Sequence, residues 1–133
     1  MYLDDWLVQS PSYPQTLVDL QTVLTEGRRL GFRFNIPKSV LTPSTSVDWL
    51  GLRWDSVSTS VSLARKNQEK IRQKIREAIF SASSSRRQWA SLVGSLNFAA
   101  QVVPLGRLWC HRLHLSGNRR FRGRAWEEVL RMP

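Results

Sequence analysis

Two adjacent carboxylates, Asp4 and Asp5, interrupt an apolar run at the start of the chain, MYLDDWLV. Two carboxylates held this close repel each other unless a cation or solvent relieves the repulsion. Proteins bind Mg²⁺ with one or two carboxylates together with water and phosphate oxygens, and paired ions of this kind promote phosphoryl transfer. The pair therefore has two interpretations, a metal site or a solvated turn, and most Asp-Asp pairs taken alone are turns.

A second group of possible metal ligands is the run Cys110, His111 and His114. All three would lie on one predicted helix, and the sequence offers no second ligand pair elsewhere. Structural zinc sites take four ligands, so helix packing is favoured over zinc for this run.

Three features of the sequence indicate an intracellular protein. Cys110 is the single cysteine, which excludes an intrachain disulfide and suits a reducing compartment. No apolar run is long enough for a transmembrane helix. The start of the chain has no basic region followed by an apolar one, as a signal peptide would. We therefore expect a location in the cytoplasm or nucleus and no secretion.

The net charge of +10 over 133 residues is distributed unevenly. Residues 1–64 carry five basic and six acidic side chains, whereas residues 65–133 carry fifteen basic and four acidic ones. Sixteen of the twenty basic residues are arginine, whose planar guanidinium can bind a phosphate through two hydrogen bonds. The second half is therefore predicted to bind nucleic acid, with an ordinary solvated basic surface as the alternative.

The first half is predicted to be a mixed α/β lobe. Residues 2–9 are expected to form two short strands around a turn at the aspartates, and residues 32–36 a further strand. The spacing of apolar residues predicts a helix over residues 15–30, with Gly31 at its C-terminal end. Residues 47–63 are expected to form a hairpin, in which 57–63 pairs with 47–54.

The second half is predicted to be helical, with a boundary between the two lobes near residue 64. Helices are expected over residues 65–80, 86–103, 107–115 and 125–131. Serines at residues 81–85 are suitable N-caps for the second of these helices.

The predicted helix over residues 86–103 carries two lines of side chains. An apolar stripe, expected to be core, consists of Trp89, Leu92, Val93, Leu96, Ala99 and Val103. The second line, Ala90, Gly94 and Phe98, is spaced by four. Because glycine inside a helix costs about 1 kcal/mol relative to alanine, Gly94 indicates a close approach, either of another helix or of a duplex minor groove.

Four segments of the chain resemble motifs of reverse transcriptases, in the order of that family. YLDD (residues 2–5) resembles the Tyr-x-Asp-Asp hairpin, GFRFNIPKSVLTP (31–43) the next palm motif, and DWLGLRWD (48–55) the primer-grip hairpin. LVGSLNFAAQVVPLG (92–106) is similar to the thumb helix of retroviral enzymes. The chain thus resembles a retroelement RNA-directed DNA polymerase, and its variant motifs look most like those of DIRS-type and retroviral-like retrotransposons.

This resemblance implies an α+β fold in two parts, with part of a polymerase palm over residues 1–64. A basic, all-α thumb and the start of the connection would follow over residues 65–133. By the resemblance Asp4 and Asp5 hold Mg²⁺ or Mn²⁺ for nucleotidyl transfer to a primer 3′ end, and Lys38 lies near the departing pyrophosphate. The residues that would contact the nucleic acid are Tyr2, Leu3, Trp49, Leu50, Gly51, Gly94 and Phe98. The basic residues expected on the phosphates are Lys66, Lys70, Lys74, Arg86 and Arg87.

The implied partners are an RNA–DNA hybrid or a DNA duplex and, in the intact enzyme, a deoxynucleoside triphosphate. In the family a further palm aspartate and the fingers precede the aspartate hairpin. We therefore expect the chain to be a fragment that does not polymerise alone, with the missing fingers and palm half in the parent polyprotein. Two alternatives stay open, a non-catalytic nucleic-acid-binding module derived from a thumb, and an unrelated basic α+β domain that docks on RNA–protein particles.

Overall fold

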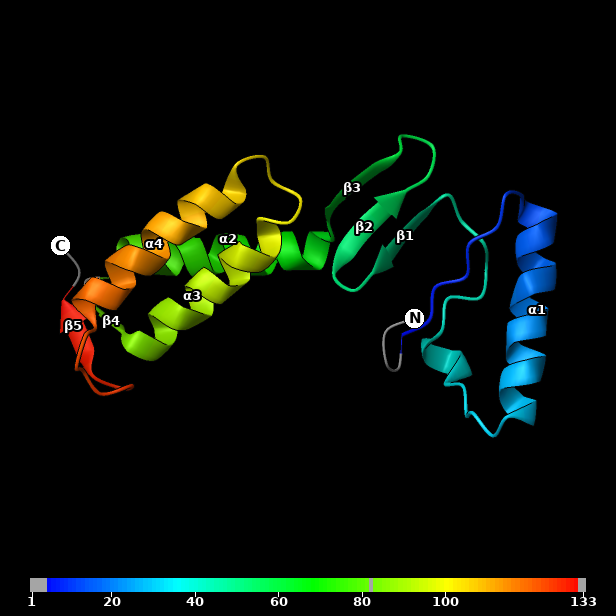
Figure 1. Ribbon diagram of the computed structural model, residues 1–133, viewed down its shortest axis with the longest axis horizontal. Helices are drawn as coiled ribbons and strands as arrows, with labels where there is room; N and C mark the ends of the chain where they lie inside the picture. Colours follow the sequence, from blue (N-terminus) through cyan, green and yellow to red (C-terminus); the bar gives the residue numbers. More distant parts are fainter. Residues whose placement is uncertain (1–4, 82, 132–133) are drawn as a thin grey trace. The chain divides into compact units, whose positions relative to one another are not determined.

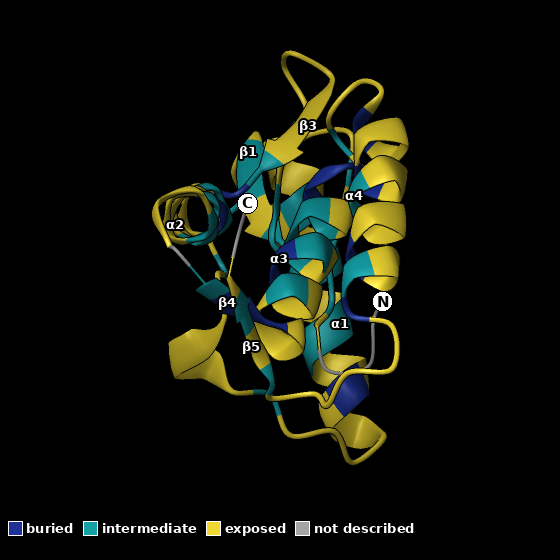
Figure 2. Ribbon diagram, turned by 90° about the vertical axis from the view of Figure 1, so that its left-hand side faces the viewer, coloured by how far each residue is buried: buried dark blue, intermediate teal, exposed yellow. Residues whose placement is uncertain are grey.

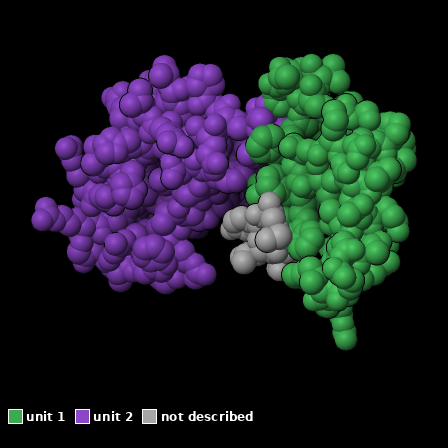
Figure 3. All heavy atoms as spheres, turned by 45° about the vertical axis from the view of Figure 1, so that its right-hand side comes forward, with its two compact units in different colours: residues 1–50, 54–60 green, residues 51–53, 61–133 purple. Residues whose placement is uncertain are grey.

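The structure is a computed structural model that describes residues 5–81 and 83–131. These residues form four α-helices, one 3₁₀ helix and two small antiparallel sheets, so the fold is mixed α+β as expected (Figure 1). The chain divides into two compact units, residues 1–50 with 54–60 (unit 1) and residues 51–53 with 61–133 (unit 2), which Figure 3 colours separately. The assignment of palm and thumb to parts of the chain stays a prediction.

Unit 1 contains one α-helix, α1 (Tyr13–Arg29), close to the predicted bounds. The Ser12 hydroxyl caps its N-terminus by accepting a hydrogen bond from the backbone N–H of Gln15. Gly31 follows the helix end with a φ of +88°, a left-handed conformation that glycine adopts without steric cost. The predicted helix and its stop are therefore confirmed.

The predicted strands over residues 6–9 and 32–36 are wrong, because neither segment forms a strand. The two segments meet through aromatic rings instead, with Trp6 edge-on to Phe32 at 5.3 Å and to Phe34 at 5.5 Å between ring centroids. An extended segment becomes a strand when a neighbour pairs with its backbone N–H and C=O groups. Ring packing brings these segments together without such a ladder.

The hairpin region forms a three-stranded sheet in the order β1 (Ser46–Trp49), β2 (Leu52–Asp55) and β3 (Ser60–Leu63). The prediction of β structure here is confirmed. Apolar spacing predicted one strand over residues 47–54, which is wrong, whereas the resemblance implied a hairpin over residues 48–55, and β1 and β2 form one there. The cause is a tight turn at Leu50 and Gly51, whose φ angles are +50° and +78°. Two successive residues with positive φ are typical of the two-residue turns that join antiparallel strands.

Unit 2 contains three helices, α2 (Arg65–Phe80), α3 (Arg86–Ala99) and α4 (Gly106–Arg120). The bounds of α2 are those predicted, whereas α3 ends before residue 103 and α4 continues beyond residue 115. A capping box starts α3: the Ser85 hydroxyl accepts from the backbone N–H of Gln88, and the Gln88 side chain accepts from the backbone N–H of Ser85.

The helix predicted over residues 125–131 is wrong, because β5 (Val129–Arg131) is a strand. It pairs antiparallel with β4 (Ser83–Ser85), so that Ser84 lies opposite Leu130. A helix of seven residues is marginal by itself, and pairing with a segment distant in the sequence decides the conformation.

The core of unit 2 lies where α3 packs against α4 and α2. Buried apolar residues there include Ile71, Leu92, Ala99, Cys110 and Phe121. The predicted apolar stripe is thus core in its central part, but Val103 lies beyond the end of α3 and is exposed. The outer face of α4 is also exposed (Figure 2). None of the helices formed by residues 5–81 and 83–131 combines the length and hydrophobicity that a membrane span requires.

Candidate nucleic-acid interface

The predicted catalytic residues fall partly within the structure. Tyr2, Leu3 and Asp4 lie outside the described residues, while Asp5 is exposed and forms an isolated β-bridge. Lys38 is exposed at the C-terminal end of the 3₁₀ helix η1 (Ile36–Lys38). Among residues 5–81 and 83–131, no group of three or more His, Cys, Asp or Glu side chains is placed to hold a metal ion. The described residues alone therefore do not supply the implied Mg²⁺ or Mn²⁺ site.

Cys110, His111 and His114 lie within the described residues and are likewise not placed to hold a metal ion together. Cys110 is buried in the core of unit 2, whereas both histidines are exposed on α4. Helix packing of the cysteine, which the sequence favours over zinc, agrees with this placement.

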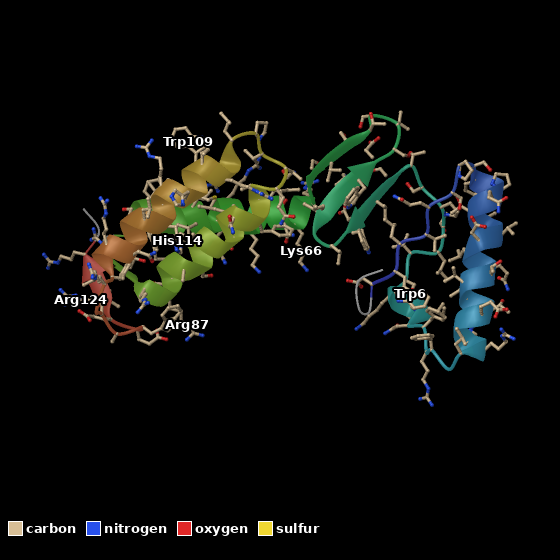
Figure 4. All side chains as sticks on the ribbon, viewed as in Figure 1. Trp6, Lys66, Arg87, Trp109, His114 and Arg124 are labelled. Carbon is tan, nitrogen blue, oxygen red and sulfur yellow. The ribbon has the colours of Figure 1, made fainter. Side chains whose placement is uncertain are left out.

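The three lysines of α2 have different surroundings. Lys66 and Lys70 are exposed and lie one helical turn apart, and Figure 4 labels the first of them. The Lys74 ammonium instead donates to the hydroxyls of Ser91 at 2.7 Å and Ser95 at 2.8 Å. Lys74 thereby connects α2 to α3, and the exposed pair is better placed to contact phosphates.

Gly51 and Phe98, two predicted nucleic-acid contacts, lie close together in the structure. A Cβ on Gly51 would lie 3.1 Å from Phe98 Cζ and would overlap the Asn67 amide, which donates to the Gly51 carbonyl at 3.1 Å. Phe98 is half-buried by this packing. Both residues therefore have a structural role in unit 2, and their contact with nucleic acid stays a prediction.

Trp49 and Leu50, the other predicted primer-grip residues, are half-buried. The Trp49 ring lies 6.1 Å from the Trp54 ring and is tilted by 56° to it. Neither indole N–H finds a hydrogen-bond acceptor within the described part of the chain. The two tryptophans form a small aromatic cluster, so Trp49 does not stand free on the surface.

Arg86 and Arg87 start α3 and hold the segment that precedes β5. The Arg86 guanidinium lies 5.2 Å from the centre of the Trp126 ring, a cation–π contact. The Arg87 guanidinium pairs with the Glu127 carboxylate at 3.0 Å. The backbone N–H of Arg87 donates to the Trp126 carbonyl. Both side chains are largely exposed, so each contact is weak and open to exchange with a phosphate.

Gly94 lies in the middle of α3, is exposed, and has nothing within 4 Å of the position that a Cβ would take. It is part of the wall of a groove of about 630 Å³ on unit 2, between α3 on one side and α4 with the loop after it on the other. The lining includes Arg86, Trp89, Asn97, His114, Arg122 and Trp126. His114 lies on the side of α4 that faces α3 (Figure 4).

The sequence analysis did not identify two residues of the second wall, Arg122 and Trp126. Arg122 precedes the helix that was predicted over residues 125–131, and Trp126 lies within it. The alternation of arginine with aromatic residues in this part of the chain, RRFRGRAW, is a signal typical of nucleic-acid contacts and could have indicated them.

Unit 2 is strongly basic. It contains sixteen basic and four acidic side chains, a net charge of +12. Three of its glutamates are in ion pairs, Glu69 with Arg65, Glu127 with Arg87 and Glu128 with Arg124. Most of the positive charge is therefore uncompensated. Comparison of the chain with protein-family models, with curated proteins and with solved structures finds no match.

Proposed function

We propose that the chain is part of a retroelement reverse transcriptase and that unit 2 binds an RNA–DNA hybrid or a DNA duplex. The observation that carries this proposal is the open surface at Gly94. Packing against another helix would explain a glycine here, but no neighbour within the described residues uses the space. Close approach of a nucleic-acid strand explains why a residue that costs about 1 kcal/mol stands in the middle of a helix.

The charge of unit 2 supports the same proposal. A hybrid duplex is A-like, with a wide, shallow minor groove that a protein reads through shape and backbone contacts. A helix surface without a side chain at Gly94 suits such a groove, and Lys66 and Lys70 are available for phosphates. Binding of this kind depends little on sequence and strongly on salt.

The polymerase part of the proposal rests on the four motifs that resemble the family. Asp4, Asp5 and Lys38 would act in nucleotidyl transfer together with the further palm carboxylate that this family uses. The ions would there activate the primer hydroxyl and stabilise the leaving oxygen. For the chain by itself we propose binding without polymerisation.

If unit 2 binds a duplex, its affinity is expected to depend steeply on salt, and Lys66 and Lys70 are expected to contribute to that dependence. The affinity for a labelled RNA–DNA hybrid is expected to fall with salt, and Lys66→Gln/Lys70→Gln is expected to reduce the log–log slope by about 2, since each phosphate contact contributes about 0.9. Fluorescence anisotropy across a series of salt concentrations measures both slopes.

The matched control removes two exposed arginines from unit 1, as Arg28→Gln/Arg33→Gln. It lowers the net charge equally and is expected to leave the slope nearly unchanged. Equal slopes for both double variants would show that net charge alone drives binding. No binding at low salt would overturn the proposal and leave the unrelated basic domain as the better interpretation.

A second prediction concerns the aspartate pair. Because the described residues supply no metal site alone, Asp4→Asn/Asp5→Asn is expected to leave hybrid binding within about twofold of the unchanged chain, with or without Mn²⁺. The same anisotropy measurement tests this. Binding that requires Mn²⁺ and is lost in the variant would mean that the pair holds an ion in this chain.

A further inference from the structure

The groove between α3 and α4 is longer than a single pocket. A second hollow of about 560 Å³ is lined by Gln101 and Arg107 and shares Val93, Asn97 and His114 with the first. The two hollows thus adjoin at these residues, and together they are called the α3–α4 groove. It follows α3, which has 14 residues and is therefore about 21 Å long.

The lining of the α3–α4 groove has the chemistry of a nucleotide site. Its cations are Arg86, Arg107 and Arg122, and no lining residue is acidic. Polar groups that can pair with base edges come from Asn97 and His114. An anionic ligand with polar, planar units would match this combination of charge and polar groups.

One tryptophan of the groove, Trp126, presents a ring on which a base can stack. The Trp126 ring is 48% exposed and is covered on one side by the Arg86 guanidinium. The Trp89 indole N–H is buried against Gly117 of α4, so Trp89 forms part of the groove wall and its N–H is out of reach of a ligand.

We propose that the α3–α4 groove binds single-stranded RNA or DNA, with a base stacked on Trp126. The base takes the place of the Arg86 guanidinium on the ring, and Arg86 and Arg122 then bind the flanking phosphates. At about 3.4 Å per stacked nucleotide, the length of α3 accommodates about six nucleotides, which is within the usual range for single-strand sites. This inference rests on the proposed function in that unit 2 binds nucleic acid, but its ligand is a single strand, whereas the proposed function concerns a duplex.

The test compares two exposed tryptophans that each lie under an arginine. Trp126 is the proposed stacking platform, and Trp109, 61% exposed with Arg112 at 5.7 Å from its ring centre, is the matched control. Figure 4 shows Trp109 on the side of α4 away from α3. Anisotropy with a labelled 12-nucleotide oligo(dT) is expected to show about tenfold weaker binding for Trp126→Ala, since stacking on one aromatic ring is worth about this much or more. Trp109→Ala is expected to bind as the unchanged chain does.

A second probe needs no variant. An abasic 12-mer keeps the phosphates but lacks the bases, and it is expected to bind about tenfold more weakly than oligo(dT). Equal binding of the two 12-mers, or equal loss in both tryptophan variants, would overturn the single-strand site. If the hybrid duplex binds but the 12-mer does not, this inference fails and the proposed function stands; if neither binds, both fail.

Discussion

Replacing Gly117 with alanine is expected to lower the free energy of unfolding of the chain by about 2 kcal/mol, because α4 lies against Trp89 at this point. A Cβ on Gly117 would overlap the indole Nε1 and Cδ1 atoms and lie 3.0 Å from Cε2. The indole cannot turn away freely, since it packs against the buried Phe121 ring. Either the ring or the whole of α4 has to move.

Thermal unfolding followed by circular dichroism measures this effect. For a unit of this size about 2 kcal/mol corresponds to a fall in Tm of about 10 °C. Gly94→Ala is the matched control, because it makes the same substitution inside a helix where the new methyl group meets nothing. It is expected to raise stability by about 0.5–1 kcal/mol.

The same glycine-to-alanine substitution is thus expected to lower the free energy of unfolding at Gly117 and to raise it at Gly94. A smaller side chain in the double variant Gly117→Ala/Trp89→Leu is expected to restore part of the lost stability by relieving the overlap. A Tm for Gly117→Ala at or above that of the unchanged chain would mean that α3 and α4 do not pack through Trp89 and Gly117.

The helices of this fold were largely predictable because their signals are local. The bounds of α2 follow from its apolar spacing, and α1 ends at Gly31 as expected. The strands were less predictable because pairing depends on distant residues. Residues 129–131 have a helical pattern in isolation but pair with the serines of β4, and residues 32–36 alternate like a strand but meet Trp6 through their rings.

The sequence predicted which residue types form the candidate site better than it predicted which other residues they contact. The resemblance to the thumb helix implied Lys66, Lys70 and Gly94 as nucleic-acid contacts, and all three are exposed. Lys74 shares their pattern, but two serines of α3 accept its hydrogen bonds. The RRFRGRAW pattern could have indicated Trp126 as a nucleic-acid contact, but its place beside α3 depends on the pairing of β5 with β4, which no local pattern indicates.

Gly94→Leu is expected to weaken binding of the RNA–DNA hybrid at least about tenfold, a loss of about 1.4 kcal/mol. A leucine side chain would project from the α3 surface at the point where the proposal brings the minor groove against the backbone. The same substitution is expected to stabilise the free chain by about 0.8 kcal/mol, because leucine is a far better helix former than glycine. Anisotropy with the hybrid and thermal unfolding measure the two effects independently.

The opposite signs make this variant decisive for the proposed function. Ser116→Leu places the same side chain on an exposed position of α4 outside the α3–α4 groove, and it is expected to leave binding unchanged. A residue kept for packing would lose stability when enlarged, whereas a residue kept for a ligand loses affinity and gains stability. If Gly94→Leu binds the hybrid as tightly as Ser116→Leu does, the open surface at Gly94 is not where the duplex lies.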